Sequence, residues 1–135
     1  MAIGADKELV RRFVREVFEE GRVESVDELV TPDFVSTSFG ITEDGPARLR
    51  AATEQIHGML RDVSFRVEDL VAEGDKVAAR LTARGTPTGP FLGIEPTGKS
   101  YEIGEIHIFR IADGRIAEHW HQFDGLGATK QLGAA

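Results

Sequence analysis

The sequence contains no cysteine, and this absence excludes several kinds of chemistry at once. A disulfide framework, a thiol nucleophile and a thiolate metal site all require cysteine. Basic residues are also few, since 16 lysines and arginines stand against 23 aspartates and glutamates, which gives a formal net charge of −7. Because an acidic surface repels phosphate groups, we expect no nucleic acid and no anionic membrane surface as a partner.

A targeting segment and a membrane-spanning run are lacking as well. The start of the chain, Met1–Glu8, leads directly into a charged helical pattern. A signal peptide would need an apolar stretch there, and a membrane helix would need about 20 apolar residues. We therefore expect a cytoplasmic protein, and the 135 residues suit a single domain over residues 1–135.

Three segments of the first half have the apolar spacing of amphipathic helices. The first runs from an N-cap at Asp6 to a stop at Gly21, and the second starts at Ser25 with a capping box. Phe34–Phe39 is a short strand or an extended segment, and a third helix starts near Pro46. The buried stripes of the first and third helices are Leu9, Val10, Phe13, Val14, Val17 and Phe18, and Leu49, Ala52, Ile56 and Leu60.

From residue 63 onward apolar residues alternate with polar ones, which is the pattern of β-strands. The expected strands are 63–71, 77–84, 100–111 and 115–123. Residues 85–99 contain four glycines and three prolines, so they form a loop long enough to act as a lid. Three helices followed by an antiparallel meander predict an α+β fold, a cone in which helices pack on one face of a curved sheet. Such a cone has a mouth through which a ligand can enter.

The turn between the last two strands decides which side chains share a face. We expect a three-residue loop at Ala112–Gly114, because glycine at its third position can take the left-handed conformation. This loop pairs Ile111 with Arg115. A two-residue Asp-Gly turn is the alternative, and it would pair Ala112 with Arg115 and invert one strand relative to the other.

Three of the four histidines of the chain lie in this hairpin. With the three-residue loop, His107 lies opposite His119 and Glu105 lies opposite His121, so one face carries three imidazoles and a carboxylate. The pattern is that of a pocket that moves protons, or of a solvated hairpin whose cross-strand pairs contribute a few tenths of a kcal/mol. With the two-residue turn, His107 would instead share its face with Glu118, Trp120, Gln122 and Asp124.

Several phrases of the chain carry a family resemblance. They are Asp27–Val35, Val67–Ala78, Gly85–Thr86, Phe91–Lys99, Ile108–Trp120, Asp124–Gly127 and Gln131–Gly133. In this order and spacing the sequence resembles the SnoaL-like polyketide cyclases, which have the NTF2-like cone fold. The resemblance implies a cofactor-free enzyme that closes a ring by intramolecular aldol condensation, using a carboxylate and a histidine inside the cone. Related members are cofactor-independent hydroxylases.

Carried over residue by residue, the resemblance places the family histidine on His107 and an acidic neighbour on Glu105. The chain departs from the family at two positions, because His121 stands where a carboxylate usually follows the tryptophan, and Pro87 stands where many members have histidine. The carboxylate's role then falls to the imidazole of His121, to Glu105 or Asp124, or is lost.

Ring closure needs a base that removes a proton and an acid that protonates the acceptor carbonyl. Two histidines in one apolar pocket repel each other when both are charged, so one tends to stay neutral while the other is protonated. We assign His121 as the base and His107 as the acid or oxyanion stabiliser, with Glu105 orienting one ring, and the two roles can be exchanged. We expect both histidines and Glu105 to line one enclosed cavity that binds a hydrophobic small molecule.

A metal is the competing interpretation of the same residues, because three histidines and Glu105 could ligate zinc or iron. The spacing of His119 and His121 is a weaker signal than a helical His-Glu-x-x-His, and the family resemblance argues against a metal, so we predict none. A hydroxylase or isomerase on the same cone, or a binding protein without catalysis, stays open.

Other residues complete the predicted site and surface. Phe65, Phe109 and Phe123 are expected as pocket wall or core, His119 as a binding residue, and Trp120 as packing or substrate contact. Asp62 could face the cone mouth, and Asp124 either caps the hairpin or contributes to binding. We also expect a homodimer through the sheet face that bears Ile106, Ile108 and Trp120.

Overall fold

The computed structural model describes residues 2–133 and places five strands in one curved sheet, in the order β1-β5-β4-β3-β2. The helices are α1 (Ala2–Phe13), α2 (Val26–Leu29), α3 (Gly45–Met59) and α4 (Gly125–Gln131), with short η1 (Val14–Glu19), η2 (Val23–Ser25) and η3 (Thr37–Phe39). The strands are β1 (Val30–Val35), β2 (Leu60–Glu73), β3 (Lys76–Pro87), β4 (Tyr101–Ala112) and β5 (Arg115–Phe123). In this part of the chain no helix is both long and apolar enough to cross a membrane.

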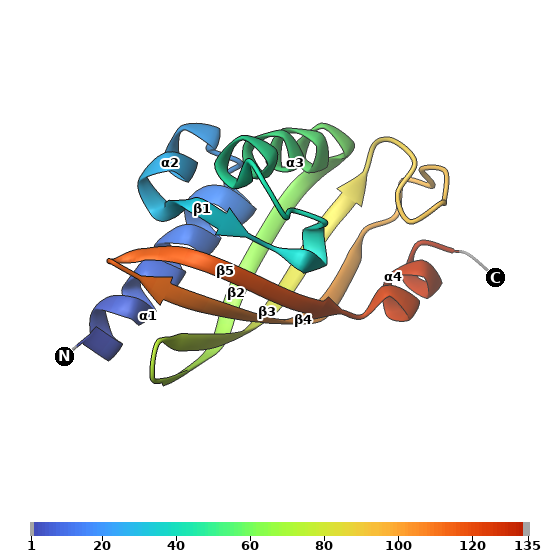
Figure 1. Cartoon of the computed structure of the whole chain (residues 1–135). Coiled ribbons are helices and arrows are strands. Elements are labelled where there is room, and N and C mark those ends of the chain that lie inside the picture. Colours follow the sequence, from blue (N-terminus) through green and yellow to red (C-terminus); the bar gives the residue numbers. More distant parts are fainter. Residues whose placement is uncertain (1, 134–135) are drawn as a thin grey trace.

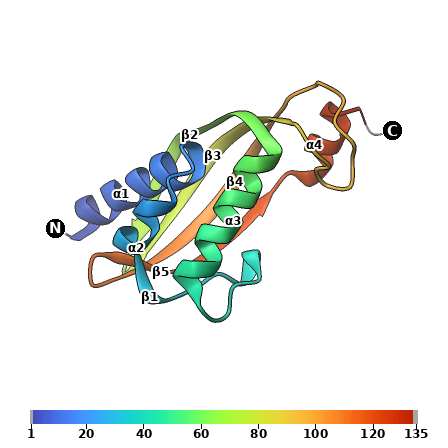
Figure 2. The same cartoon turned by 90° about the horizontal axis from the view of Figure 1, so that it is seen from above.

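The helices α1, α2 and α3 lie on the same side of the sheet, which confirms the predicted α+β cone (Figures 1 and 2). Alternating residues of the strands point toward these helices, and the period-two pattern of the sequence is the cause. The core between the layers includes Val10, Phe13, Val14, Val17, Leu29, Leu49, Leu81, Phe109 and Ile116, each at most 1% exposed.

Two elements differ from the predicted meander. β1 covers Val30–Val35 and pairs with β5 in parallel, so the sheet is mixed. Pro32 is tolerated there because β1 is an edge strand. The short helix α4 was not predicted, since its seven residues include two glycines. Its start is fixed by Asp124, whose side chain accepts a hydrogen bond from the Gly127 backbone N–H at 2.8 Å.

The predicted three-residue turn between β4 and β5 is wrong. Asp113 and Gly114 form a two-residue turn with φ values of 53° and 75°, and Ala112 pairs with Arg115. Positive φ at both central residues is the requirement of the type I′ turn, which Asp-Gly favours. By itself, this turn would place the histidines of β5 on the sheet face opposite to His107. The inversion is avoided because β5 carries an extra residue, Ala117, in a β-bulge.

The bulge returns the histidines to one face. His107 pairs with His121, and Phe109 pairs with His119, so the partners are shifted by two residues from the predicted ones. Glu105 now lies opposite Phe123. The shared face of three imidazoles and a carboxylate is therefore confirmed, although the opposing pairs are not those expected.

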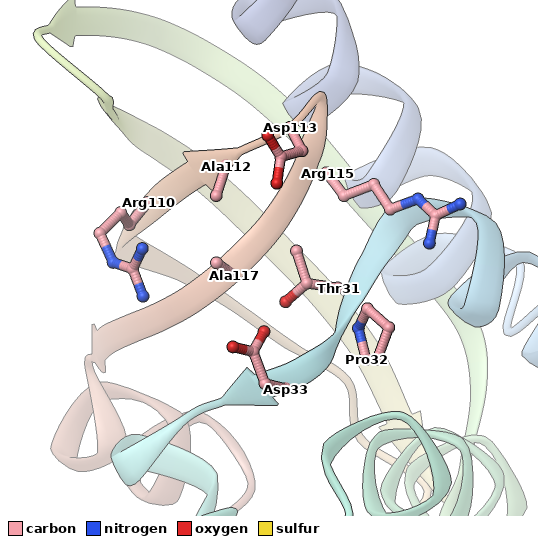
Figure 3. A pocket seen from close by; sticks show the side chains of 8 residues that line it. All are labelled: Thr31, Pro32, Asp33, Arg110, Ala112, Asp113, Arg115 and Ala117. Carbon is pink, nitrogen blue, oxygen red and sulfur yellow. The ribbon is translucent and has the colours of Figure 1, made fainter.

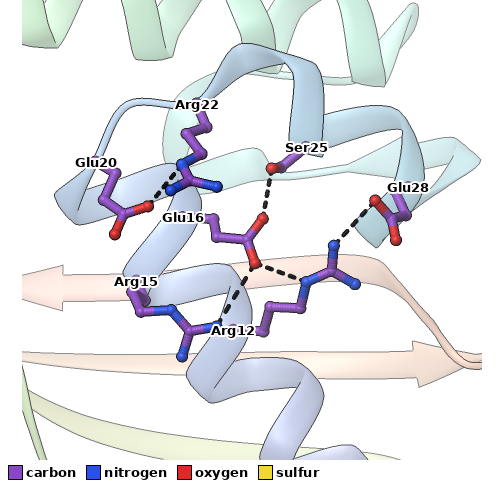
Figure 4. Close-up of polar contacts among 7 residues, drawn as sticks. All are labelled: Arg12, Arg15, Glu16, Glu20, Arg22, Ser25 and Glu28. Carbon is purple, nitrogen blue, oxygen red and sulfur yellow. Dashed lines mark hydrogen bonds and ion pairs between the residues drawn. The ribbon is translucent and has the colours of Figure 1, made fainter.

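The first helix differs from its prediction at its start and in its second half. It begins at Ala2 rather than at Asp6, and its second half is the π-helical segment η1. The predicted stop at Gly21 is confirmed, since Gly21 follows the C-cap residue Glu20 with a φ of 67°. Ser25 does not cap a helix with its side chain in the described structure; its hydroxyl donates to Glu16 Oε1 at 2.6 Å. Glu16 also accepts from Arg12 Nε at 2.7 Å, and Arg12 reaches Glu28 at 2.9 Å (Figure 4). This network ties η1 to the segment that leads into β1.

Replacing Glu16 by glutamine is expected to lower the free energy of unfolding by about 2 kcal/mol at pH 7, because hydrogen bonds to charged groups contribute roughly 1.5–3 kcal/mol each. The bonds from Ser25 and Arg12 hold the pKa of the Glu16 carboxyl below its ordinary value. Its contribution is therefore present above that ordinary value and is lost as the pH falls through the lowered pKa. Urea unfolding at pH 7 and in acid measures both effects.

The matched control is Glu8→Gln. The Glu8 side chain is 78% exposed and lies 3.6 Å from Arg11, and such an exposed pair contributes about 0–1 kcal/mol. Equal destabilisation by the Glu8 and Glu16 substitutions, or a gap that widens in acid, would show that the Glu16 network does not stabilise the fold in this way.

Candidate active site

A continuous chain of hydrogen bonds crosses the inner face of β4 and β5. Glu105 Oε1 lies 2.7 Å from His107 Nε2, and His107 Nδ1 lies 2.8 Å from His119 Nε2. His119 Nδ1 lies 2.9 Å from the hydroxyl of Ser36, which follows β1 and is 83 residues away in the sequence. Ser36, His119 and His107 are at most 2% exposed. The four side chains thus form one buried network with Glu105 at its end.

The hydrogen bonds have a defined direction when both imidazoles are neutral. An ionised carboxylate only accepts, so His107 Nε2 donates to Glu105. His107 Nδ1 then accepts from His119 Nε2, and His119 Nδ1 accepts from the Ser36 hydroxyl. Burial, followed by repulsion from His107 and His121, holds the pKa of His119 well below its ordinary value. His119 is therefore neutral at pH 7, as this order of protons requires.

His121 stands beside this network without belonging to it. Its ring stacks on that of His107 with 5.0 Å between centroids. Burial, and then the nearby His107, lower the pKa of His121, while the carboxylate of Glu105 opposes the shift. Its Nδ1 is buried and has no hydrogen-bond partner within residues 2–133. A neutral imidazole with an unpaired nitrogen is suited to accept a proton or a hydrogen bond from a ligand.

Phenylalanines enclose the imidazoles. Phe18 packs against His107 with ring centroids 5.1 Å apart, and Phe109 lies on the core side. On the other side, Phe39 lies 4.9 Å from His121 and Phe123 lies 5.7 Å from it. Phe39 and Phe123 are 37% and 44% exposed. We call Phe39, His121 and Phe123 the aromatic rim, and it is the side on which the histidine cluster meets solvent.

The sequence pattern missed three residues of this site. Ser36 caps the start of the short helix η3 and Phe39 is its last residue, and only the chain path after β1 brings them to β5. Phe18 comes from η1, and its ring reaches two of the imidazoles. Wide π-helical turns occur frequently at functional sites. Phe18 belonged to the predicted apolar stripe, but no spacing rule distinguishes a stripe residue at a site from one in the core.

Comparison with known proteins identifies the family of the chain. The sequence model of the SnoaL-like polyketide cyclases matches residues 8–132. The chain is 31% identical to nogalonic acid methyl ester cyclase of Streptomyces nogalater, over 86% of this chain and 89% of that protein. It is 29% identical to aklanonic acid methyl ester cyclase DnrD of Streptomyces peucetius, over 93% of this chain and 89% of that protein. The chain belongs to the SnoaL-like polyketide cyclase family.

A solved structure gives the same result for the fold. TsrD from Streptomyces laurentii is 36% identical and superimposes with a TM-score of 0.87, over 98% of this chain and 97% of that one. The predicted family and its NTF2-like cone are thus confirmed. The predicted site residues remain predictions, and the structure shows only where each of them lies.

Several predicted binding residues lie away from the histidine cluster of this SnoaL-like chain. Trp120 points to the outer face of the sheet, opposite Ile108. Asp62 is exposed at an irregular position of β2, with a φ of 55°, and pairs with Arg61 at 3.2 Å. Asp124 caps α4, as described above. Phe65 is half-buried and lies 5.4 Å from the ring of Phe18, so it borders the site.

Two hollows on the outside of the sheet are lined by described residues. One, of about 670 Å³, lies between β1 and the hairpin of β4 and β5, where Thr31 and Asp33 face Arg110 and Ala117 (Figure 3). It contains none of the clustered histidines. The other, of about 400 Å³, runs over Ile106, Ile108 and Trp120 and touches His121 from the outside.

Proposed function

We propose that this chain catalyses an intramolecular aldol ring closure of a hydrophobic polyketide ester, with His121 as the base. The proposal rests on the half-buried imidazole of His121, which belongs to the aromatic rim, stays neutral at pH 7 and has no hydrogen-bond partner for its Nδ1 within residues 2–133. Similarity to two methyl ester cyclases over most of the chain supports the reaction class. We further propose that residues 1–135 act as one cytoplasmic domain.

The proposed reaction begins at a carbon flanked by carbonyl groups. His121 removes a proton from this carbon, and the electrons of the C–H bond form an enolate. The enolate carbon then attacks a second carbonyl carbon of the same molecule, which forms a C–C bond and leaves an alkoxide. The alkoxide takes a proton from the His121 imidazolium. The product is an isomer of the substrate, and the histidine returns to its neutral form.

The hydrogen-bond network gives Glu105 and His107 supporting roles. Glu105 lies close enough to raise the pKa of His121, so its negative charge stabilises the imidazolium that forms during the reaction. Both ring nitrogens of His107 are already bonded, and the residue is 2% exposed. The proposal therefore assigns His107 to the positioning of Glu105 rather than to direct contact with the substrate as acid or oxyanion stabiliser.

The test is turnover of nogalonic acid methyl ester by the purified chain. The ester is incubated with the protein and EDTA, once without oxygen and once in air, and the products are separated and their masses are measured by mass spectrometry. We expect a cyclised product of unchanged mass. A product that gains oxygen, formed only in air, would favour a hydroxylase, and binding of the ester without conversion would favour a binding protein.

We also infer that the outer face of the sheet joins two copies of the chain. Ile106 and Ile108 are 46% and 38% exposed there, next to Trp120 and the hollow of about 400 Å³. Contiguous apolar surface of this kind favours association. The face is the one that the three packed helices leave uncovered (Figure 1).

Replacing Ile108 by glutamate is expected to convert the dimer into a monomer, because a charge would be buried in the interface without a partner. Light scattering at tens of micromolar measures the mass. The control is Ile56→Glu, at a 41% exposed apolar position on α3, which lies on the other side of the sheet. A monomeric wild-type chain, or equal dissociation by both substitutions, would contradict the proposed interface.

A further inference from the structure

We propose that His107, His119 and His121 form a binding site for a divalent transition metal, best suited to Zn²⁺, and that the bound metal switches off the acid/base chemistry. The inference goes beyond the proposed function, which operates on the metal-free chain. Each histidine offers one ring nitrogen, and these three atoms lie within 4.8 Å of one another.

The spacing of the rings matches that of imidazoles around one metal. With Zn–N bonds of about 2.0–2.1 Å and tetrahedral angles, ring centroids lie about 5 Å apart. The observed centroid distances are 5.1 Å for His107 and His119, 5.0 Å for His107 and His121, and 5.5 Å for His119 and His121. The positions of the ring centres thus fit a common metal. The rings now lie 13–30° from parallel and must tilt so that their inner nitrogens converge on it.

The outward-facing nitrogens already have the partners that metal-bound histidines require. A ligating histidine usually donates its other N–H to a carboxylate, carbonyl or water, which fixes its orientation. Glu105 occupies that position on His107 Nε2, and Ser36 occupies it on His119 Nδ1. His107 Nδ1 and His119 Nε2 are left facing each other at 2.8 Å, inside the cluster.

The metal replaces the proton between these two nitrogens. In the metal-free network His119 carries its proton on Nε2, whereas with metal bound the proton is on Nδ1 and is donated to Ser36. A serine hydroxyl can accept as well as donate, so the bond to Ser36 is kept. The two nitrogens move apart by about half an ångström, since nitrogens that share a tetrahedral zinc are about 3.3 Å apart. No net proton is lost in this exchange.

His121 supplies the third ligand. Its buried Nδ1 lacks a partner in the described structure, and a metal at the cluster would provide one. The fourth position then faces the aromatic rim and is free for water, as in zinc sites with three protein ligands. Because the metal occupies the lone pair of the proposed base, metal binding and proton abstraction by His121 exclude each other.

Calorimetric titration of untagged, EDTA-treated protein with ZnCl₂ tests the site, and Co²⁺ serves as a visible probe. We expect one equivalent per chain and the strong visible absorption of four-coordinate Co²⁺. His121→Ala should weaken Zn²⁺ binding by at least about 100-fold, because loss of an outer partner alone costs about 10–100-fold. Ser36→Ala should weaken it by about 10–100-fold. The control His57→Gln removes the histidine outside the cluster and should bind Zn²⁺ like the wild type.

Circular dichroism of each variant verifies that it is folded, and His121→Ala, at a half-buried position, keeps the test valid if Ser36→Ala fails to fold. Absence of a stoichiometric Zn²⁺ site, or unchanged affinity in His121→Ala, would overturn the proposal.

The inhibitory role of the metal is tested by ester turnover, and this test rests on the proposed function. Zn²⁺ should abolish ester turnover and EDTA should restore it. If the metal-free chain shows no turnover, the proposed function fails while the binding data still decide the metal site. Zinc bound at the histidines with undiminished turnover would disprove the inhibitory role.

Discussion

Replacing His121 by alanine is expected to lower the turnover of the ester at least about 100-fold, since general acid/base groups typically contribute 10²–10⁴-fold. The residue lies at the aromatic rim and is only half-buried. Its removal should therefore leave the fold intact, and the loss should fall on kcat more than on KM. Steady-state kinetics of nogalonic acid methyl ester conversion, with the unfolding curve of the variant beside it, measure both.

Two further variants separate base chemistry from packing. In the family that the sequence resembles, a carboxylate usually follows the tryptophan, and His121→Asp restores it. This variant should therefore have a higher turnover than His121→Ala. His57→Gln removes a histidine that bonds to the Phe18 carbonyl oxygen at 2.9 Å, outside the cluster, and should keep turnover within a few-fold of the wild type. Near-normal rates in His121→Ala would reject His121 as the base.

The pH dependence follows from the environment of His121. A base must be neutral to act, and burial together with His107 lowers the pKa of this imidazole. Lowering the pKa keeps the neutral form populated at more acidic pH. The acid limb of kcat/KM should therefore lie below the ordinary histidine value of about 6.5. Replacing Glu105 by glutamine removes the charge that opposes the shift, so the limb should move to still lower pH.

Replacing Phe109 by alanine is expected to lower the free energy of unfolding by about 3–5 kcal/mol, the range for large aromatic residues removed from a core. Phe109 is fully buried and packs against Phe13 at 5.6 Å and His119 at 5.1 Å between ring centroids. The sequence left open whether it was pocket wall or core, and the burial identifies it as core beneath the histidines. Chemical denaturation measures the loss.

Phe123→Ala is the matched comparison, because Phe123 is 44% exposed at the aromatic rim. It should cost about 1–1.5 kcal/mol in stability, since only about half of its surface leaves water on folding and full burial of such a side chain contributes about 1.5–3 kcal/mol, and it should raise KM for the ester. Similar destabilisation by the two substitutions would contradict the distinction between core and rim. So would a Phe109→Ala variant with wild-type stability.

Local patterns were sufficient for most of the helices and strands, although not for β1 or α4. The stripe from Val10 to Val17 and the alternation through β2, β3 and β4 predicted where helices and strands lie, because side-chain periodicity follows directly from backbone geometry. The same alternation placed Glu105 and His107 on one face of β4. Composition excluded thiol chemistry, since the chain has no cysteine.

The tertiary structure alone decided how the site is assembled. The expected turn was wrong, and the bulge at Ala117 restored the shared face, because the register of a hairpin depends on small energy differences between turns and bulges. Ser36 reaches His119 only because β1 pairs in parallel with β5, a contact between segments 83 residues apart. The unpaired nitrogen of His121 likewise depends on which side chains pack around it. Spacing along the chain determines which face a residue takes, whereas partners distant in sequence are determined by how the layers pack.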